Sequence, residues 1–337
     1  MTKKGILLVN LGTPDSTKVG DVRRYLREFL SDERVIDIHP LGRFLLVNFI
    51  IAPFRAPKSA HEYQKLWTEK GSPLKYHSLQ LVELLQKELG DDYVVELAMR
   101  YQNPSIQSAL EALKKHPLES LLVIPLFPQY ASATSGSVHQ EVMRILSKWP
   151  LIPKTTFLDA FPTQPTMIRA FVENAEKFRT QHTYDHYLFT YHGLPERQLK
   201  KADAQCLTST NCCHEFSARN RLCYRAQCYE TSRKLAEAMG IEEKNYTVSF
   251  QSRLGKDPWI QPYTDETIEK LAKNGCKKLL VFSPSFVADC LETTIEIGEA
   301  YAELFREKGG ERLDLVESLN TSATWVKALK EIVLENE

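Results

Sequence analysis

The 337-residue sequence lacks several features that would assign it to a class directly. Its 43 basic and 43 acidic side chains cancel, so it has no single-signed field of the kind that holds a nucleic-acid backbone. No apolar run reaches the roughly 20 residues that a membrane-spanning helix needs, and the N-terminal residues show no signal-peptide pattern. We therefore expect a cytoplasmic protein with no nucleic-acid partner.

Common nucleotide-binding and catalytic motifs are also missing. The chain has no Gly-x-x-x-x-Gly-Lys-Ser/Thr loop and no Gly-x-Gly-x-x-Gly after a predicted strand. It has neither a Gly-x-Ser-x-Gly elbow nor a His-Glu-x-x-His pair. Dehydrogenase and hydrolase functions are therefore disfavoured.

What the sequence does contain is an alternation of short apolar runs with amphipathic helical patterns. This is typical of an α/β protein in which helices cover both faces of a parallel sheet. Apolar residues with helical spacing predict helices at 21–30, 164–180 and 229–239. Strands are predicted at 6–10, 94–98, 121–125, 187–190, 246–250 and 279–283.

The two halves of the chain resemble each other. Residues 7–14, Leu-Leu-Val-Asn-Leu-Gly-Thr-Pro, match residues 188–195, Leu-Phe-Thr-Tyr-His-Gly-Leu-Pro. We infer two similar doubly wound, Rossmann-like domains, with a ligand cleft between them beyond the carboxyl ends of the strands. The predicted division is an N-terminal domain at 1–160, a C-terminal domain at 161–318 and a C-terminal helix at 319–337.

A histidine follows a predicted strand in the second half. His192 comes directly before Gly193, and its counterpart in the first half is Leu11. A fold needs no ionisable group there, which indicates a function, although a structural histidine is the alternative.

Three acidic residues follow the strand predicted at 279–283. Asp289, Glu292 and Glu296 have spacings that place them on one face of a helix. A solvated acidic helix start is the alternative. A histidine together with carboxylates suits proton removal coupled to the handling of a divalent metal.

Five of the seven cysteines crowd into residues 206–228, with polar residues between them that suggest an exposed loop. Grouped thiolates usually hold metal, but the paired Cys-x-x-Cys knuckles of structural zinc are absent. Cys276 is interpreted as an ordinary thiol. Cys290, beside the acidic residues, is either a bystander or a weak metal contact.

The longest apolar stretch is 41–54, which Gly42, Arg43, Asn48 and Pro53 interrupt. It is either an exposed apolar lip, which touches a membrane or admits an apolar substrate, or an irregular part of the core.

At these residues the sequence resembles the ferrochelatases, which insert Fe²⁺ into protoporphyrin IX to form protohaem, releasing two protons, at the last step of haem biosynthesis. The resemblance covers nearly the whole chain. Its motifs occur in order at 8–14, 71–74, 99–101, 125–130, 191–195, 250–253, 258–259 and 289–293.

The resemblance implies a lyase whose catalytic pair is His192 and Glu292, with Glu296 completing the site for the iron substrate. It also implies that 41–54 is the lip where porphyrin enters, with peripheral membrane contact there, in a monomer or homodimer. Porphyrin contacts are implied for Leu11, Arg100, Tyr101, Tyr130 and Trp259.

Some ferrochelatases carry a [2Fe–2S] cluster, and some bacterial members supply its ligands from an internal segment that 206–228 resembles. Ser132 stands where enzymes with a C-terminal cluster place a remote cysteine, which argues against that arrangement. Zinc on the same ligands, or no metal, is the alternative. Because adjacent cysteines seldom both bind, the expected ligands are Cys206, Cys213, Cys223 and Cys228, with Cys212 as the substitute.

Two points stay open at this stage. His192 either accepts pyrrole protons or guides the metal to the ring, while Glu292 and Glu296 relay charge. The alternatives to a ferrochelatase are a two-lobed module that binds a tetrapyrrole or metal without chemistry, and a related chelatase that loads cobalt or nickel.

Overall fold

The structure is a computed structural model, and it describes residues 2–203, 205–207, 212–213, 215–253, 255 and 257–337. Residues 208–211 and 214 of the predicted cysteine loop lie outside the described residues.

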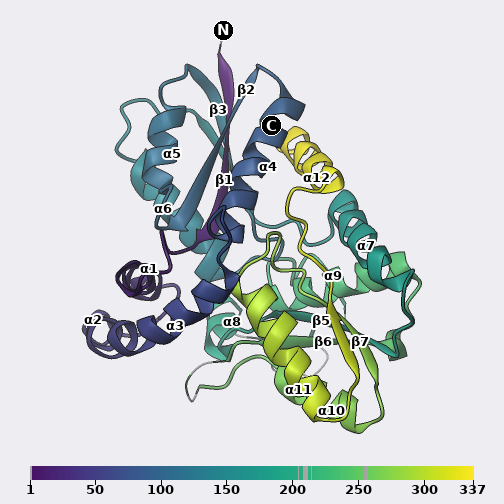
Figure 1. The fold of residues 1–337 in the computed structure, drawn as a ribbon. Coiled ribbons are helices and arrows are strands. Elements are labelled where there is room, and N and C mark those ends of the chain that lie inside the picture. The colour runs from purple at the N-terminus through teal and green to yellow at the C-terminus, as the bar shows by residue number, and fades with distance from the viewer. Residues whose placement is uncertain (1, 204, 208–211, 214, 254, 256) are drawn as a thin grey trace. The chain divides into compact units, whose positions relative to one another are not determined.

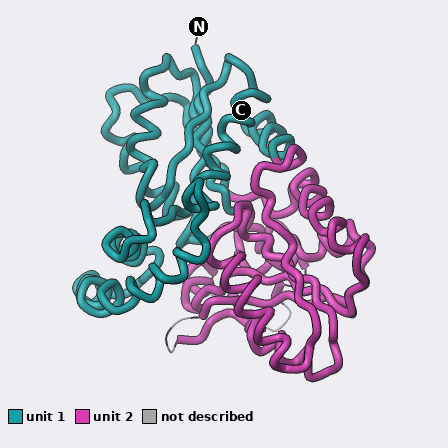
Figure 2. The backbone as a smooth tube through the Cα atoms, in the orientation of Figure 1, with its two compact units in different colours: residues 1–127, 131–159, 326–337 teal, residues 128–130, 160–325 magenta. Residues whose placement is uncertain are grey.

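The chain divides into two compact units (Figure 2). The cleft expected between the two halves stays a prediction, as do the domain limits at 160 and 318. Unit 1 comprises residues 1–127, 131–159 and 326–337, and unit 2 comprises 128–130 and 160–325.

Unit 1 is built on a parallel sheet of four strands in the order β2-β1-β3-β4. Strands β1, β2 and β3 are labelled in Figure 1. The apolar run of β1 is buried on both faces, as a central parallel strand requires. Helices α5 and α6 supply apolar side chains to one core with β1, β2 and β3. The strands are β1 (Lys3–Gly12), β2 (Tyr93–Tyr101), β3 (Leu118–Pro125) and β4 (Lys154–Phe157). The helices are α1 (Val19–Ser31), α2 (Pro40–Leu45), η1 (Leu46–Ile51), α3 (Ala52–Leu66), α4 (Pro73–Leu89), α5 (Ile106–Leu113), η2 (Ser132–Gly136), α6 (Ser137–Leu146) and most of α12 (Ala323–Glu335).

Unit 2 repeats this topology with the order β6-β5-β7-β8. Its strands are β5 (His186–His192), β6 (Tyr246–Gln251), β7 (Lys278–Phe282) and β8 (Arg312–Leu315). Its helices are α7 (Pro165–Arg179), α8 (Glu196–Ala202), α9 (Tyr224–Met239), η3 (Glu243–Asn245), α10 (Thr264–Lys273), η4 (Leu291–Tyr301) and α11 (Ala302–Glu307).

The equal strand order of the two sheets confirms the predicted α/β class with two similar halves. The prediction missed β4 and β8, which are four-residue strands at the sheet edges. It also began the helix at 229–239 five residues too late. Helix α9 starts at Tyr224 because Tyr224, Ala226 and Cys228 are buried against the unit.

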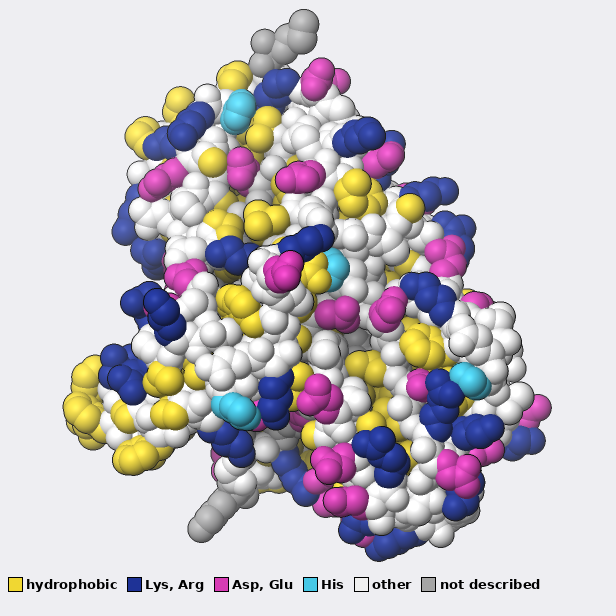
Figure 3. Space-filling view, viewed as in Figure 1, with side chains coloured by type: hydrophobic (Ala, Val, Ile, Leu, Met, Phe, Trp, Pro, Cys, Tyr) yellow, Lys and Arg dark blue, Asp and Glu magenta, His cyan; other side chains and the backbone are white. Residues whose placement is uncertain are grey.

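The stretch 41–54 forms nearly all of α2, the π-helix η1 and the start of α3. It is not an irregular core segment. Six of its apolar side chains are exposed, with Phe49 63% and Phe54 79% accessible, and Figure 3 shows them as a yellow group at the lower left. No helix among the described residues is long and apolar enough to cross a membrane. We call this surface the apolar lip: Leu41, Phe44, Leu45, Phe49, Ile50 and Phe54.

Candidate active site

His192 is the last residue of β5, at the carboxyl edge of the unit 2 sheet, where it pairs with Gln251 of β6. Nδ1 of its half-buried ring lies 2.7 Å from the Gly193 carbonyl oxygen. Because a carbonyl only accepts, Nδ1 donates this hydrogen bond, and the lone pair of the neutral ring is on Nε2. The His192 carbonyl oxygen accepts a hydrogen bond from the Tyr224 hydroxyl at 2.7 Å. Backbone and ring are therefore both held, with Nε2 as the basic atom.

The two glutamates of the predicted site lie in η4, a π-helix that begins just past the end of β7. Burial raises the pKa of the Glu296 carboxyl, the nearby Glu292 carboxylate raises it further, and the His192 ring lowers it. Such mutual effects require short separations. The structure brings His192, Glu292 and Glu296 together at one edge of one sheet, because Gln251, which pairs with His192, reaches both glutamates with its side-chain amide.

Three polar side chains hold the Glu296 carboxylate. The Ser252 hydroxyl lies 2.8 Å from both carboxylate oxygens. The Tyr301 hydroxyl donates to Oε1 at 3.2 Å, and the Gln251 amide donates to Oε2 at 3.4 Å. The same amide reaches the Glu292 carbonyl oxygen at 3.3 Å, so β6 and η4 are tied together at the site.

Asp289 does not belong to this group. The helix begins at Leu291, so Asp289 precedes it. Its carboxylate accepts hydrogen bonds from the Asn320 amide at 2.7 Å and from the Ser318 N–H at 3.2 Å. The expected row of three carboxylates is therefore wrong for Asp289, whose carboxylate fixes a turn instead.

Cys290 is the N-cap residue of η4 and is buried, with its N–H bonded to the Thr293 hydroxyl. Burial raises the pKa of its thiol well above the usual range. A neutral, buried thiol is a poor metal ligand. This favours the interpretation of Cys290 as a bystander over that of a weak metal contact.

Trp259 lies beside the histidine, with its ring centroid 6.3 Å from that of the His192 imidazole. A backbone bridge between Pro195 and Trp259 holds it there. A Cβ atom on Gly193 would lie 2.8 Å from the Gln251 carbonyl oxygen and 3.1 Å from Cε3 of Trp259. Glycine is therefore needed for the close approach of these two segments.

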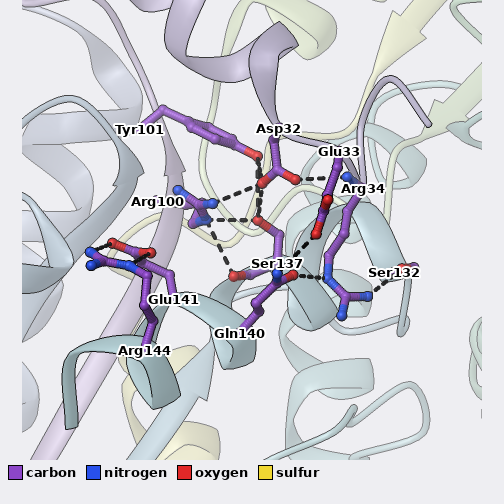
Figure 4. A network of polar contacts seen from close by, with 10 residues as sticks. All are labelled: Asp32, Glu33, Arg34, Arg100, Tyr101, Ser132, Ser137, Gln140, Glu141 and Arg144. Carbon is purple, nitrogen blue, oxygen red and sulfur yellow. Dashed lines mark hydrogen bonds and ion pairs between the residues drawn. The ribbon is translucent and has the colours of Figure 1, made fainter. Parts of the chain in front are cut away.

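Arg100 and Tyr101 end β2 in unit 1, where a buried polar network holds them (Figure 4). Asp32 is its centre. One carboxylate oxygen accepts hydrogen bonds from Arg100 at 2.8 Å, from the Tyr101 hydroxyl at 2.9 Å and from the Ser137 hydroxyl. Tyr101 is fully buried. Direct porphyrin contact by this pair stays a prediction.

The remaining predicted porphyrin contacts are half-buried. Leu11 precedes the last residue of β1, and Tyr130 lies in the short segment of unit 2 that precedes η2. The Tyr130 N–H donates to the Gln227 side chain at 2.5 Å. Their contact with a ligand also stays a prediction.

The cysteines of the 206–228 segment gather at the N-terminus of α9, and all are free thiols. The sulfurs of Cys206 and Cys223 are 3.9 Å apart, and those of Cys212 and Cys213 are 3.6 Å apart. Hydrogen bonds from the Cys206 and Cys213 thiols, and from the first N–H groups of α9, lower the pKa of Cys223. Cys206 and Cys213 are buried, so the segment is not an exposed loop throughout.

Cys228 differs from the other four because it lies within α9 and is completely buried. Burial raises the pKa of its thiol well above the usual range, and the Tyr224 side chain is its hydrogen-bonding neighbour. Within the described part of the chain, no three His, Cys, Asp or Glu side chains already form a complete metal site.

The family comparison decides the identity. The ferrochelatase family model matches residues 3–337. The chain belongs to the ferrochelatase family. Ferrochelatase of Legionella pneumophila (strain Lens) is 46% identical over 333 residues, 99% of each chain. Ferrochelatase of Coxiella burnetii (strain Dugway 5J108-111) is 46% identical over 334 residues, 97% of this chain and 92% of that one.

Solved structures show the fold of this ferrochelatase family member again. SirB from Bacillus subtilis with Fe³⁺ aligns with a TM-score of 0.59 over 99% of this chain and 95% of that chain. The two sequences are only 12% identical, so this likeness shows the fold alone. It agrees with the two similar α/β halves.

Sequence reasoning missed the residues that hold the candidate site residues in place. Gln251 and Ser252 had a detectable signal, because they follow a predicted strand within a family motif. Asp32 and Tyr224 had none. Asp32 ends a helix, and Tyr224 was hidden in a segment interpreted as a loop.

Proposed function

We propose that this chain inserts Fe²⁺ into protoporphyrin IX, releasing two protons, with its reactive groups at the carboxyl edge of the unit 2 sheet. The observation that carries the proposal is the meeting of His192, Glu292 and Glu296 there, in a chain of the ferrochelatase family. Iron is the substrate of this reaction.

His192 supplies the base. Its Nδ1–H is committed to the Gly193 carbonyl, so Nε2 presents a lone pair beside the Trp259 ring. Porphyrin metallation requires removal of two pyrrole protons, and a flat ring hides its nitrogens. Aromatic contact such as Trp259 offers binds the ring, and part of that binding energy bends it to expose a nitrogen.

The carboxylates handle the charge. Burial raises the pKa of the Glu296 carboxyl, and the nearby Glu292 carboxylate raises it further. Carboxylate oxygens and an imidazole also suit Fe²⁺, so the same three groups fit both proton relay and metal delivery. His192 as a proton acceptor and His192 as a guide for the metal predict different kinetic changes when its ring is removed.

A His192→Ala variant tests the proposal. We expect metallation to fall by about 10²- to 10⁴-fold, the usual contribution of a positioned acid or base, while porphyrin binding is retained. If His192 removes protons, higher pH or added imidazole restores part of the rate; if it guides iron, the KM for iron rises instead. His186→Ala, at the other end of the same strand, is the control. Ordinary metallation by the His192→Ala protein would overturn the proposal.

The same assay separates the rival functions. Purified protein is given porphyrin with Fe²⁺, Co²⁺, Ni²⁺ or Zn²⁺, and the absorption spectrum is followed. A binding module would shift the porphyrin spectrum without producing a metallated ring. A cobalt or nickel chelatase would prefer that ion to Fe²⁺ in competition.

We further propose that the cysteine segment holds a [2Fe–2S] cluster. Two thiolates on one tetrahedral metal, each bonded at about 2.3 Å, lie about 3.8 Å apart. The Cys206–Cys223 and Cys212–Cys213 pairs have this spacing, which suits one pair on each iron, so here the adjacent cysteines can both bind although such pairs seldom do. Cys228 stays as the alternative fourth ligand, but its burial beside Tyr224 favours Cys212.

Anaerobically purified protein tests this proposal. We expect visible absorption with two iron and two sulfide per chain. Cys212→Ser removes the cluster and Cys228→Ser keeps it if Cys212 is the fourth ligand, and the reverse holds for Cys228. A colourless, zinc-loaded protein would exclude the cluster.

We also propose that the apolar lip makes peripheral membrane contact and admits the porphyrin. Six exposed apolar side chains on three successive helices are a larger group than scattered surface residues explain. An apolar entry favours protoporphyrin over a porphyrin with more carboxylates.

A further inference from the structure

Tyr224 joins the cysteine segment to the catalytic strand. It is the first residue of α9 and follows Cys223, the N-cap residue, directly in the chain. Its hydroxyl donates to the His192 carbonyl oxygen at 2.7 Å. A predicted cluster ligand is therefore followed directly in the chain by the residue that donates a hydrogen bond to the catalytic histidine.

The link is stiff at its cysteine end. The Cys223 sulfur lies 3.9 Å from that of Cys206, and Cys223 is the N-cap residue of α9. Any change that draws these sulfurs together or apart therefore acts on the first turn of α9. Tyr224, whose ring is 7% exposed, moves with that turn.

The link is also specific at its histidine end. The His192 carbonyl belongs to the peptide that joins it to Gly193, and the His192 ring is oriented by the Gly193 carbonyl. The Gly193 N–H is bonded to the Gln251 carbonyl oxygen at 2.8 Å. Rotation of this peptide would change the contact that fixes which ring nitrogen carries the proton.

We propose that Tyr224 is a positioning residue, through which the occupied cysteine site holds the His192 ring in its reactive orientation. The proposal rests on the proposed function of His192 and of the cysteine segment. It gives the metal site a role at the active site that needs no electron transfer.

The test is NMR of the metal-loaded protein with ¹³C,¹⁵N-labelled histidine, in which His192→Gln assigns the His192 ring. We expect Tyr224→Phe to keep its metal content but to lose the single Nδ1–H tautomer of His192. Its kcat should fall roughly tenfold, with the KM for porphyrin within twofold, because a small misplacement of a reacting group is costly.

Tyr191→Phe is the matched control. Tyr191 is buried like Tyr224 and precedes His192 directly, but its hydroxyl is bonded to Ser232 at 2.8 Å. It should leave the His192 ring signals unchanged. Equal effects of Tyr191→Phe and Tyr224→Phe would show a general loss of packing and overturn the proposal.

A double-mutant comparison tests the coupling itself. Cys206→Ser should shift the His192 ring signals when Tyr224 is present and have no further effect in the Tyr224→Phe protein. Additive shifts, or a wild-type protein that binds no metal, would overturn the proposal. The ring signals report the coupling without catalysis, so an active His192→Ala protein would refute the proposed function separately.

Discussion

The Ser252 hydroxyl lies 2.8 Å from both carboxylate oxygens of Glu296, at the point where β6 meets the π-helix η4. This contact favours the charged carboxylate, as does the nearby His192 ring. Burial, together with the Glu292 carboxylate, disfavours the charged form more strongly. The pKa of Glu296 is therefore raised. The site thus raises the pKa of a carboxyl that lies near the His192 ring.

Glu296→Gln should therefore change how stability depends on pH. A carboxyl whose pKa is higher in the folded than in the unfolded protein stabilises the fold below its unfolded pKa, and that contribution is lost as pH rises through the folded pKa. The amide has no such loss. The stability of Glu296→Gln relative to the wild type should rise above the ordinary carboxyl pKa of 4.5 and then level off.

Urea unfolding of the metal-free proteins between about pH 4.5 and 8 measures this difference. Glu299→Gln is the matched control, because Glu299 lies in the same helix and is exposed. Parallel curves for the wild type and Glu296→Gln would contradict the raised pKa.

Gly193→Ala tests how tightly the histidine segment is packed. The new Cβ would lie 2.8 Å from the Gln251 carbonyl oxygen, so the backbone beside His192 must move. We expect a loss of about 1–3 kcal/mol in unfolding free energy and a clear fall in metallation. In Gly20→Ala, where nothing lies within 4 Å of the Cβ, stability should rise by about 0.5–1 kcal/mol. Activity unchanged by Gly193→Ala would show that this backbone is adaptable.

Asp32→Asn tests the network in unit 1. The Arg100–Asp32 pair is largely buried, so removing the charge of Asp32 leaves the guanidinium unpaired and costs roughly 3 kcal/mol. Glu141→Gln breaks the exposed Arg144 pair of the same region and should cost less than about 1 kcal/mol. Unfolding in denaturant measures both. Similar costs for the two variants would show that the buried network carries little stability.

The sequence predicted the central strands because their apolar runs are long and buried on both faces, as in β1 and β5. The edge strands β4 and β8 have four residues each, too few to show a period. The π-helix η4 has side-chain spacing close to that of an α-helix over one turn, so its sequence predicts a helix but not its type.

Some residues of the candidate site could likewise be predicted from the sequence, and others could not. His192 and Glu292 could be found because ionisable residues stand where a strand end needs none. Tyr224 could not be found, because its role depends on α9 turning back onto β5, and no local pattern records a contact between residues 32 positions apart. Asp289 was wrongly placed on the helix because its spacing to Glu292 and Glu296 fits a helical face. The helix begins two residues after it.

The apolar lip should lose membrane affinity, but not stability, when its exposed rings are removed. Phe49→Ser and Phe54→Ser remove side chains that are already accessible, so the unfolding free energy should change by less than about 0.5 kcal/mol. Each ring that enters an apolar layer contributes at least about 1.5 kcal/mol, so each substitution should weaken binding to phosphatidylcholine vesicles by tenfold or more. Leu151→Ser is the matched control, because Leu151 is 86% exposed and lies outside the lip. Vesicle flotation measures the binding. If all three variants float like the wild type, the lip does not contact the membrane, and its apolar residues serve porphyrin entry alone.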